Sequence, residues 1–186
     1  SIEYLFNKQW NGKGFDINGN ILYELNNGNG KVKEYDDFNL VFEGEYLNGK
    51  KNGKGKEYDN GKLEYEGEYL NGNKHGKGKE YNEDGNIIFE GEYLYNFKSK
   101  GKQYDCEGNY LMYEGEYLDN KKWNGKGYAK NGKIIYELVN GNGKVIEYYP
   151  HGEKKFEGEY LNGKKNGYGK EYDGYGILAF EGEYII

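Results

Sequence analysis

The chain has 186 residues and a formal net charge of −6, and its basic side chains are lysines, since arginine is absent. An acidic, arginine-free surface is a poor ligand for nucleic acids, because it lacks both the positive charge and the forked guanidinium that phosphates bind. The mean hydropathy of −1.14 is low, but 18% of the residues are aromatic. Each buried ring removes about 150–250 Å² from water, so the composition predicts a folded chain.

Few features of the sequence indicate a cellular location. Cys106 is the single cysteine, so a disulfide within the chain is excluded and a reducing compartment is favoured. The sequence contains no hydrophobic run of about 18 residues, which a membrane-spanning helix needs, and no recognisable signal peptide. We therefore expect a cytoplasmic protein.

Internal repeats organise the whole chain. An aromatic residue opens each copy at intervals of roughly 23 residues, and about eight copies fill residues 1–186 as one repeat domain. The clearest copy, FEGEYLNGKKNGKGKEY at Phe42–Tyr58, returns almost unchanged at Phe156–Tyr172. The fold must therefore be understood first as one copy and then as a row of copies.

The array begins with an incomplete copy and a short one. Residues Glu3–Leu5 match the middle of a later copy, so the first copy lacks its opening residues. The short copy Tyr23–Tyr35 returns 113 residues later as Tyr136–Tyr148. Leu25 and Leu138 replace the glycine that the other copies have at this position, so we expect the stacking of these two copies to differ.

A full copy predicts a β-hairpin. Across residues 63–69, apolar residues or glycine alternate with charged ones, which is the period of a half-buried strand. In the copy that begins at Phe42, the corresponding strand is followed by Asn48-Gly49. This pair favours a reversal of chain direction, because both residues tolerate positive φ. The segment Lys54–Tyr58 then resumes as the second strand.

The glycines and lysines of the hairpin have expected packing roles. Gly44 lies between two aromatic residues on the apolar face, so we expect a ring from the neighbouring hairpin to lie on its backbone. Lys54 and Lys56 are expected to face Glu43 and Glu45 across the hairpin, at roughly 0.2–1 kcal/mol per pair.

The array ends in another incomplete copy. The segment Phe180–Ile186 has the first strand of a hairpin and no second strand. Repeat arrays need terminal caps, so we expect either a longer parent protein or ends that pair with another molecule.

These residues resemble a known family. The pattern Tyr/Phe-Glu-Gly-Glu-Tyr, followed by Gly-Lys and Gly-x-Gly, resembles MORN repeats over essentially the whole chain, and the Lys-Glu-Tyr ending resembles MORN variant repeats. The resemblance implies an all-β fold, an elongated antiparallel β-hairpin repeat solenoid with a single sheet twisted along its length. It also implies protein–protein contact, scaffolding and dimerisation. Phospholipid binding, attributed to such repeats, is disfavoured here by the negative charge.

The sequence offers no convincing catalytic group. Gly44–Lys51 nearly matches a phosphate-binding loop, but Lys51 replaces the hydroxyl residue that would bind the metal, and the segment lies in a hairpin. His75 and His151 fall in predicted loops, and Cys106 has no nearby histidine to activate it. We therefore predict no catalytic, metal or cofactor site, and no enzyme activity.

Five aromatic residues depart from the repeat pattern and are the candidate partner contacts. Exposed aromatic residues often anchor partners, although the same rings could cover sheet edges. Two precede Gly-x-Gly where other copies have lysine, two replace the Asn-Gly-Lys of a hairpin loop, and one interrupts Gly-x-Gly. In chain order they are Trp10, Tyr95, Phe97, Trp123 and Tyr168.

We therefore expect a non-catalytic scaffold or protein–protein interaction module. Its partner would be a protein of unknown identity, or a second copy bound through the open ends. The alternative is a ligand-binding repeat module for a glycan, a cell-wall component or a phospholipid headgroup, using the off-pattern aromatics. Solenoids that bind choline or the cell wall are richer in tryptophan than this chain, so the alternative ranks second.

Overall fold

The computed structural model describes residues 3–5, 8–16 and 18–185. Every element of regular secondary structure within these ranges is a β-strand, which confirms the predicted all-β fold. The incomplete copies predicted at the two ends include residues 1, 2 and 186, which lie outside the described residues. No described segment forms a helix with the length and hydrophobicity needed to cross a membrane. The chain falls into two compact units, residues 1–85 with 93–96, and residues 86–92 with 97–186.

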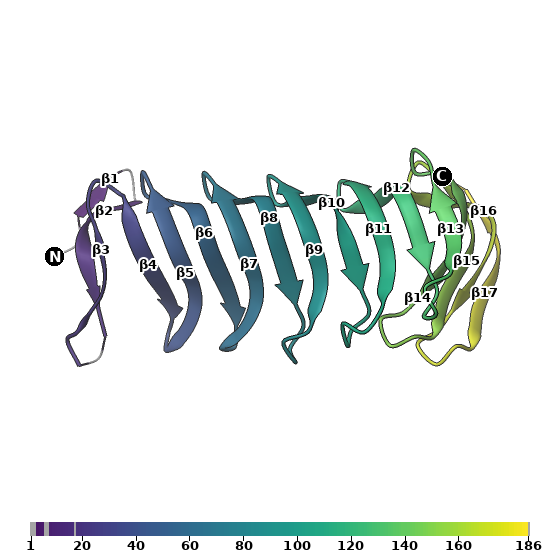
Figure 1. Cartoon of the computed structure of the whole chain (residues 1–186), viewed down its shortest axis with the longest axis horizontal. Coiled ribbons are helices and arrows are strands. Elements are labelled where there is room, and N and C mark those ends of the chain that lie inside the picture. Colours follow the sequence, from purple (N-terminus) through teal and green to yellow (C-terminus); the bar gives the residue numbers. More distant parts are fainter. Residues whose placement is uncertain (1–2, 6–7, 17, 186) are drawn as a thin grey trace. The chain divides into compact units, whose positions relative to one another are not determined.

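The first unit consists of consecutive antiparallel hairpins (Figure 1). Its first three strands form one sheet, and its next five lie side by side in chain order in another. Residues 93–96, at the end of β9 (Ile87–Leu94) and in the turn after it, also belong to this unit. The strands are β1 (Glu3–Leu5), β2 (Lys8–Phe15), β3 (Ile21–Leu25), β4 (Gly30–Asp36), β5 (Asn39–Leu47), β6 (Lys50–Asp59), β7 (Lys62–Leu70) and β8 (Asn73–Tyr81).

The second unit repeats this architecture. Strands β10 to β13 follow one another in one sheet, and β14 to β17 form another. The paired strands are antiparallel, as the hairpin prediction requires. The strands are β10 (Phe97–Tyr104), β11 (Leu111–Leu118), β12 (Lys121–Tyr128), β13 (Ile134–Leu138), β14 (Gly143–Tyr148), β15 (Lys154–Leu161), β16 (Lys164–Tyr172) and β17 (Leu178–Tyr184).

An aromatic ring lies over a pair of opposed glycines in each full hairpin. Gly44 is paired with Gly55, and a Cβ built on Gly44 would stand 2.6 Å from the Phe42 ring and 2.7 Å from the Gly55 Cα. A Cβ on Gly55 would stand 2.7 Å from the same ring. Opposed glycine pairs also occur at Gly67/Gly78, Gly91/Gly101, Gly115/Gly125 and Gly158/Gly169.

The expectation that the neighbouring hairpin supplies this ring is therefore wrong. Phe42 belongs to the same hairpin as Gly44, and it reaches the glycine pair because side chains two residues apart share a face of a strand. The neighbouring hairpin contributes a second ring instead. Tyr69 lies 3.1 Å from the position that a Cβ on Gly55 would take.

Edge-to-face contacts then link one hairpin to the next. The Tyr69 ring packs 5.5 Å from the Phe42 ring at 86° and 5.6 Å from the Tyr65 ring at 85°. Tyr93 continues the series 5.3 Å from Tyr65. Such contacts contribute about 0.5–1.5 kcal/mol each beyond the area they bury. A single hairpin is marginal in water, so this shared core is what makes the row stable. In the second unit Tyr117 contacts Phe89 and Tyr113 in the same way.

The hairpin turns bond to one another along one edge. Asn48 and Gly49 have φ values of 52° and 70°, as a two-residue turn with two positive φ angles requires. The Gly49 N–H donates to the Gly28 carbonyl at 2.9 Å, and the Gly72 N–H donates to the Lys51 carbonyl at 2.8 Å. Successive turns are therefore held at a fixed spacing by backbone hydrogen bonds.

The sheet is interrupted in each unit at the short copy, where the sequence predicts altered stacking. A single isolated bridge, Asn26 with Asn29, lies between β3 and β4, and Val139 with Asn142 lies between β13 and β14. Leu25 and Leu138 are each 2% exposed, so their side chains fill the core where the other copies have glycine. The opening ring of each short copy lies on a glycine of the preceding strand, as Tyr136 does on Gly127. The regular ladder stops just after the leucine.

The ring-on-glycine packing predicts a selective effect of alanine. A Cβ on Gly67 would stand 2.3 Å from the Tyr65 hydroxyl and 2.7 Å from the Gly78 Cα. Gly67→Ala should therefore lower the free energy of unfolding by about 1–3 kcal/mol in urea denaturation. Gly174→Ala is the control, because a Cβ there meets nothing closer than 3.9 Å. Equal stability of Gly67→Ala and wild type would contradict the packing.

Candidate interaction surface

Each sheet has an inner face, which carries the buried rings, and an outer face on the opposite side. On the inner face a lysine ammonium lies over the opening ring of each full copy. The Lys51 Nζ is 4.0 Å from the centre of the Phe42 ring, and the Lys74 Nζ is 4.1 Å from that of Tyr65. A cation over a ring contributes roughly 0.5–2 kcal/mol. The same contact joins Lys98 with Phe89, Lys122 with Tyr113, and Lys165 with Phe156.

Glutamates complete this inner-face network. The Glu57 carboxylate lies 2.9 Å from the Lys74 ammonium and 3.3 Å from that of Lys51. Burial raises the pKa of Glu57, but the hydrogen bond and charge of Lys74, together with Lys51, bring it below its ordinary value. In the second unit Glu147 accepts a hydrogen bond from the Tyr160 hydroxyl at 3.0 Å and pairs with Lys122 at 3.2 Å. These charges hold the repeats together.

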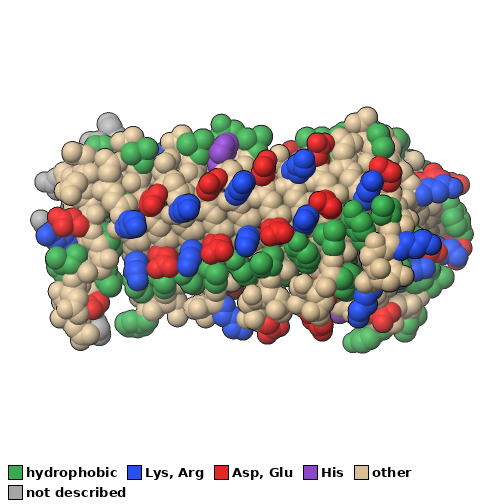
Figure 2. All heavy atoms as spheres, viewed as in Figure 1, with side chains coloured by type: hydrophobic (Ala, Val, Ile, Leu, Met, Phe, Trp, Pro, Cys, Tyr) green, Lys and Arg blue, Asp and Glu red, His purple; other side chains and the backbone are tan. Residues whose placement is uncertain are grey.

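On the outer face, the strand register sets lysine opposite glutamate. Lys56 is paired with Glu43 across its hairpin, as predicted, and with Glu66 of the next hairpin. Figure 2 shows lysine and acidic side chains alternating in rows over the strands of the first unit, with hydrophobic side chains along their borders. Exposed pairs of this kind, such as Lys33 with Glu43 at 3.7 Å, contribute about 0–1 kcal/mol each. Because lysine and glutamate alternate, neither positive nor negative charge dominates the outer face.

The expected pairing of Lys54 with Glu45 across the hairpin is replaced by another arrangement. Lys54 is paired with Glu68 of the next hairpin, because residues 52–54 form a bulge opposite Glu45. The Glu45 carboxylate accepts a hydrogen bond from the Lys54 backbone N–H at 3.3 Å. Gly53 has φ +81°, and a Cβ there would stand 2.1 Å from the carboxylate oxygen. The glycine-rich segment therefore binds a carboxylate of its own chain.

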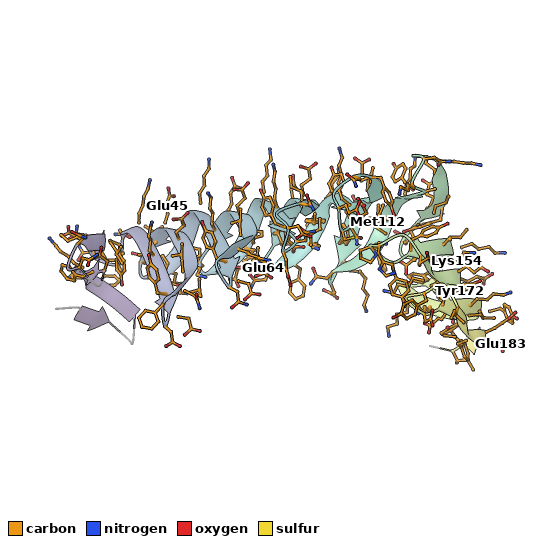
Figure 3. All side chains as sticks on the ribbon, turned by 90° about the horizontal axis from the view of Figure 1, so that it is seen from below. Glu45, Glu64, Met112, Lys154, Tyr172 and Glu183 are labelled. Atoms are coloured by element: carbon orange, nitrogen blue, oxygen red, sulfur yellow. The ribbon has the colours of Figure 1, made fainter. Side chains whose placement is uncertain are left out.

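Tyrosine hydroxyls donate hydrogen bonds to the glutamates of the outer face. The Tyr58 hydroxyl donates to Glu43 at 2.7 Å, and that of Tyr81 donates to Glu66 at 2.6 Å. Burial and the hydrogen bond to Glu43 raise the pKa of Tyr58 to about 12. In the second unit Tyr172 lies beside Lys154, with the ammonium 5.3 Å from the centre of the ring (Figure 3).

The sequence places Trp123 at the position that Lys51 has in the full copy, and the structure shows that this equivalence is wrong. Lys122 is paired with Tyr117, as Lys51 is paired with Tyr46, and Trp123 is an extra residue at the register shift. The bulge of this hairpin is one residue shorter than that of the full copy. Gly125, the first glycine of its Gly-x-Gly, therefore pairs with Gly115, whereas in the full copy the second glycine, Gly55, pairs with Gly44. A Cβ built on Gly141 would stand 2.7 Å from the Trp123 ring, so the ring covers the turn of the short copy.

Trp10 occupies the equivalent place in the first unit. It is half-buried in β2, and its carbonyl accepts a hydrogen bond from the Gly28 N–H at 2.6 Å. The Trp123 carbonyl accepts from the Gly141 N–H in the same way, at 2.8 Å. The two tryptophans are therefore each tied to the turn of a short copy.

The other three candidates are more exposed. Tyr95 is 55%, Phe97 48% and Tyr168 56% exposed. Tyr95 lies in a hairpin turn, with φ 50°, and its ring centre is 5.2 Å from that of His75. The Tyr168 hydroxyl donates to Glu181. Within each unit the candidate residues lie in different hairpins, so they do not form one compact site.

The two histidines and the cysteine also have defined surroundings. His75 lies within β8 rather than in a loop, in the bulge that stands opposite Glu68. His151 lies in a turn, with its ring stacked 5.3 Å from that of Tyr149 and its Nε2 2.8 Å from the Gly174 carbonyl oxygen. Cys106 lies in another turn, where its N–H donates to the Pro150 carbonyl at 3.2 Å. The described part of the chain holds no cluster of His, Cys, Asp and Glu suited to a metal ion.

Sequence reasoning missed a row of leucines. A leucine precedes the turn of each full hairpin, on the outer face, since the preceding residue is an inner-face ring. Leu47 is 47% and Leu94 51% exposed, and Leu70 is half-buried. Its signal in the sequence is the leucine before Asn-Gly in successive copies, at Leu47, Leu70 and Leu161, and before the altered turns at Leu94 and Leu118.

Comparison with known families supports this description. The MORN repeat family model matches residues 42–62, 65–87 and 156–174. A comparison with curated proteins found no match. The three matched segments contain full hairpins with the Gly-x-Gly bulge, and the chain carries MORN repeats at these three places.

The inner-face network predicts a pH-dependent effect at Glu57. Glu57→Gln should lower the free energy of unfolding at neutral pH by about 1–2 kcal/mol, because Lys74 and Lys51 lose a charged partner. The lowered pKa of Glu57 makes this contribution present above about pH 4.3 and lost as the pH falls through the folded-state pKa. The difference between the two proteins should therefore shrink in acid.

Urea denaturation at a series of pH values measures this effect. Glu83→Gln is the matched control, because Glu83 pairs with Lys62 on the exposed surface and its replacement should change the stability at neutral pH by less than about 0.5 kcal/mol. A difference between Glu57→Gln and wild type that stays constant down to pH 3 would rule out the linkage.

Proposed function

We propose that this chain is a non-catalytic scaffold that binds other proteins along its β-hairpin repeats. The observation that carries the proposal is the alternation of lysine and glutamate over the outer face, as in Lys33, Glu43, Lys56 and Glu66. A polyanion such as an anionic membrane favours a face of one sign. A protein surface can offer both signs in register, which gives specificity and orientation.

The exposed off-pattern aromatics support a protein partner. Tyr95 and Phe97 are each about half exposed beside a hairpin turn. Tyrosine and phenylalanine are enriched at protein interfaces, where they bury a large area at a low cost in conformational entropy. A second copy of this chain is included among the partners, since alternating charges can complement themselves.

A catalytic role finds little support among the polar groups. Glu57 and Glu147 are engaged by lysine, and Glu45 holds a backbone N–H. A general acid or base needs a group free to exchange a proton with a substrate, and these carboxylates serve the fold. The proposal for the whole chain is therefore binding without chemistry.

Binding of a glycan or a phospholipid headgroup is the weaker candidate. The Trp123 ring is packed on Gly141, and the Tyr168 hydroxyl is bound to Glu181. Both rings are thus engaged within the chain, and the lysines of the outer face have glutamate neighbours. None of these features favours such a ligand over a protein.

Two probes test the proposal, a phage-displayed library of protein domains and vesicles of phosphatidylcholine with phosphatidylserine. We expect enriched domain clones, some of which lose about tenfold or more in affinity with Tyr95→Ala or Phe97→Ala, made singly. Phe38→Ala is the matched control, because Phe38 is exposed at a different turn. Co-sedimentation with the vesicles at about 0.15 M salt, without enrichment of domains, would contradict the proposal.

A further inference from the structure

The first unit presents three leucines in line on its outer face. Leu47, Leu70 and Leu94 occupy the same position in three successive hairpins, each directly before the two-residue turn. Each follows an inner-face tyrosine, so strand alternation points the leucine to the outer face. Single exposed leucines are ordinary on protein surfaces, but a row at a constant repeat is a patterned apolar surface.

Hydrogen bonds fix the spacing of this leucine row. The Gly72 N–H donates to the Lys51 carbonyl at 2.8 Å, and the Asn96 N–H donates to the Lys74 carbonyl at 2.9 Å. The turns that follow the three leucines are therefore tied to the hairpins before them. Each step along the row crosses two strands, or about 9.6 Å at the usual strand separation. The row is preorganised, which lowers the entropic cost of binding.

Two kinds of polypeptide ligand come close to this spacing, and the chemistry of the row decides between them. An α-helix rises 1.5 Å per residue, so residues seven apart recur on one face about every 10.5 Å. An extended strand presents side chains of one face about every 6.8 Å, and neither this distance nor twice it fits 9.6 Å. A polyproline II segment recurs about every 9.3 Å, but such segments dock into grooves lined by aromatic rings. The leucine row is aliphatic, so the helix is favoured.

The charges beside the row have the same period. Glu45 and Glu68 lie one hairpin apart, two residues before a leucine, and Lys54 and Lys77 lie one hairpin apart on β6 and β8. An amphipathic helix with basic and acidic residues at seven-residue intervals can match both sets. Tyr95, next to Leu94, extends the apolar surface, and its ring is braced by His75.

We propose, on the basis of the scaffold function above, that the leucine row of the first unit binds an amphipathic α-helix of a partner protein. Apolar side chains seven residues apart on the helix contact Leu47, Leu70 and Leu94. Charged side chains flanking them pair with the rows that contain Glu45 and Lys54. The partner is thereby defined by its seven-residue repeat rather than by a linear motif.

Selection from two displayed libraries on the intact chain tests this inference. One library presents a helical hairpin with one randomised helix face, and the other presents proline-rich linear peptides. We expect enriched helices with apolar residues seven apart, whose affinity falls about tenfold or more for the double variant Leu47→Ser and Leu94→Ser. The double variant Leu47→Met and Leu94→Met should keep the affinity, since methionine preserves apolar volume.

Controls separate binding from folding. The double variant Ile21→Ser and Phe38→Ser removes other exposed apolar residues and should leave helix binding unchanged. Circular dichroism and urea denaturation of each variant verify that the chain is folded when binding is measured.

The two proposals fail in different ways. Enriched helices that are insensitive to the leucine variants, or dominant proline-rich peptides with apolar residues three apart, would overturn the helix inference and leave protein binding intact. Absence of binders from both helical and linear libraries, together with binding to anionic vesicles, would overturn the scaffold function as well.

Discussion

The architecture depends on the room that two opposed glycines leave for one aromatic ring. Phe42 lies over Gly44 and Gly55 at distances where a methyl group on either glycine would collide with the ring. The same ring packs nearly perpendicular to that of Tyr69, the second tyrosine of the next hairpin, and so links the two hairpins. The lysine over the ring and the glutamate beside that lysine follow from the same placement. In the short copies leucine replaces the glycine, and the ladder stops just after it, as between β13, which ends at Leu138, and β14.

Because of this packing, the inner and outer faces of the sheet have different roles. The inner face uses its polar groups to seat the rings, as Lys74 and Glu57 do. The outer face is left with rows of alternating charge and a border of leucines, which the core does not need. A repeated surface of this kind is suited to ligands that are themselves periodic, and a helix with a seven-residue repeat is a common example.

Much of the fold was predictable from local pattern, and the register was not. Alternation in residues 63–69 and the Asn-Gly turns predict strands and reversals, because each depends on the backbone of a few residues. The pairing partner of a glycine in Gly-x-Gly depends on the length of a bulge, which packing decides, so the equivalence of Trp123 with Lys51 was wrong. Tyr95 and Phe97 were singled out by their break in the pattern, which left their exposure open, and the structure leaves each about half exposed. The leucine row was overlooked because a leucine at a strand end resembles core.

The most direct measurement of the central claim is the proton chemical shift of the glycine Hα atoms in a chain labelled at glycine. Protons that face an aromatic ring are shifted upfield by its ring current. The account predicts upfield Hα shifts for Gly44, Gly55, Gly67 and Gly78, and ordinary shifts for Gly61, which has nothing within 4 Å. Ordinary shifts at all four paired glycines would show that the rings do not lie on them and would contradict the account.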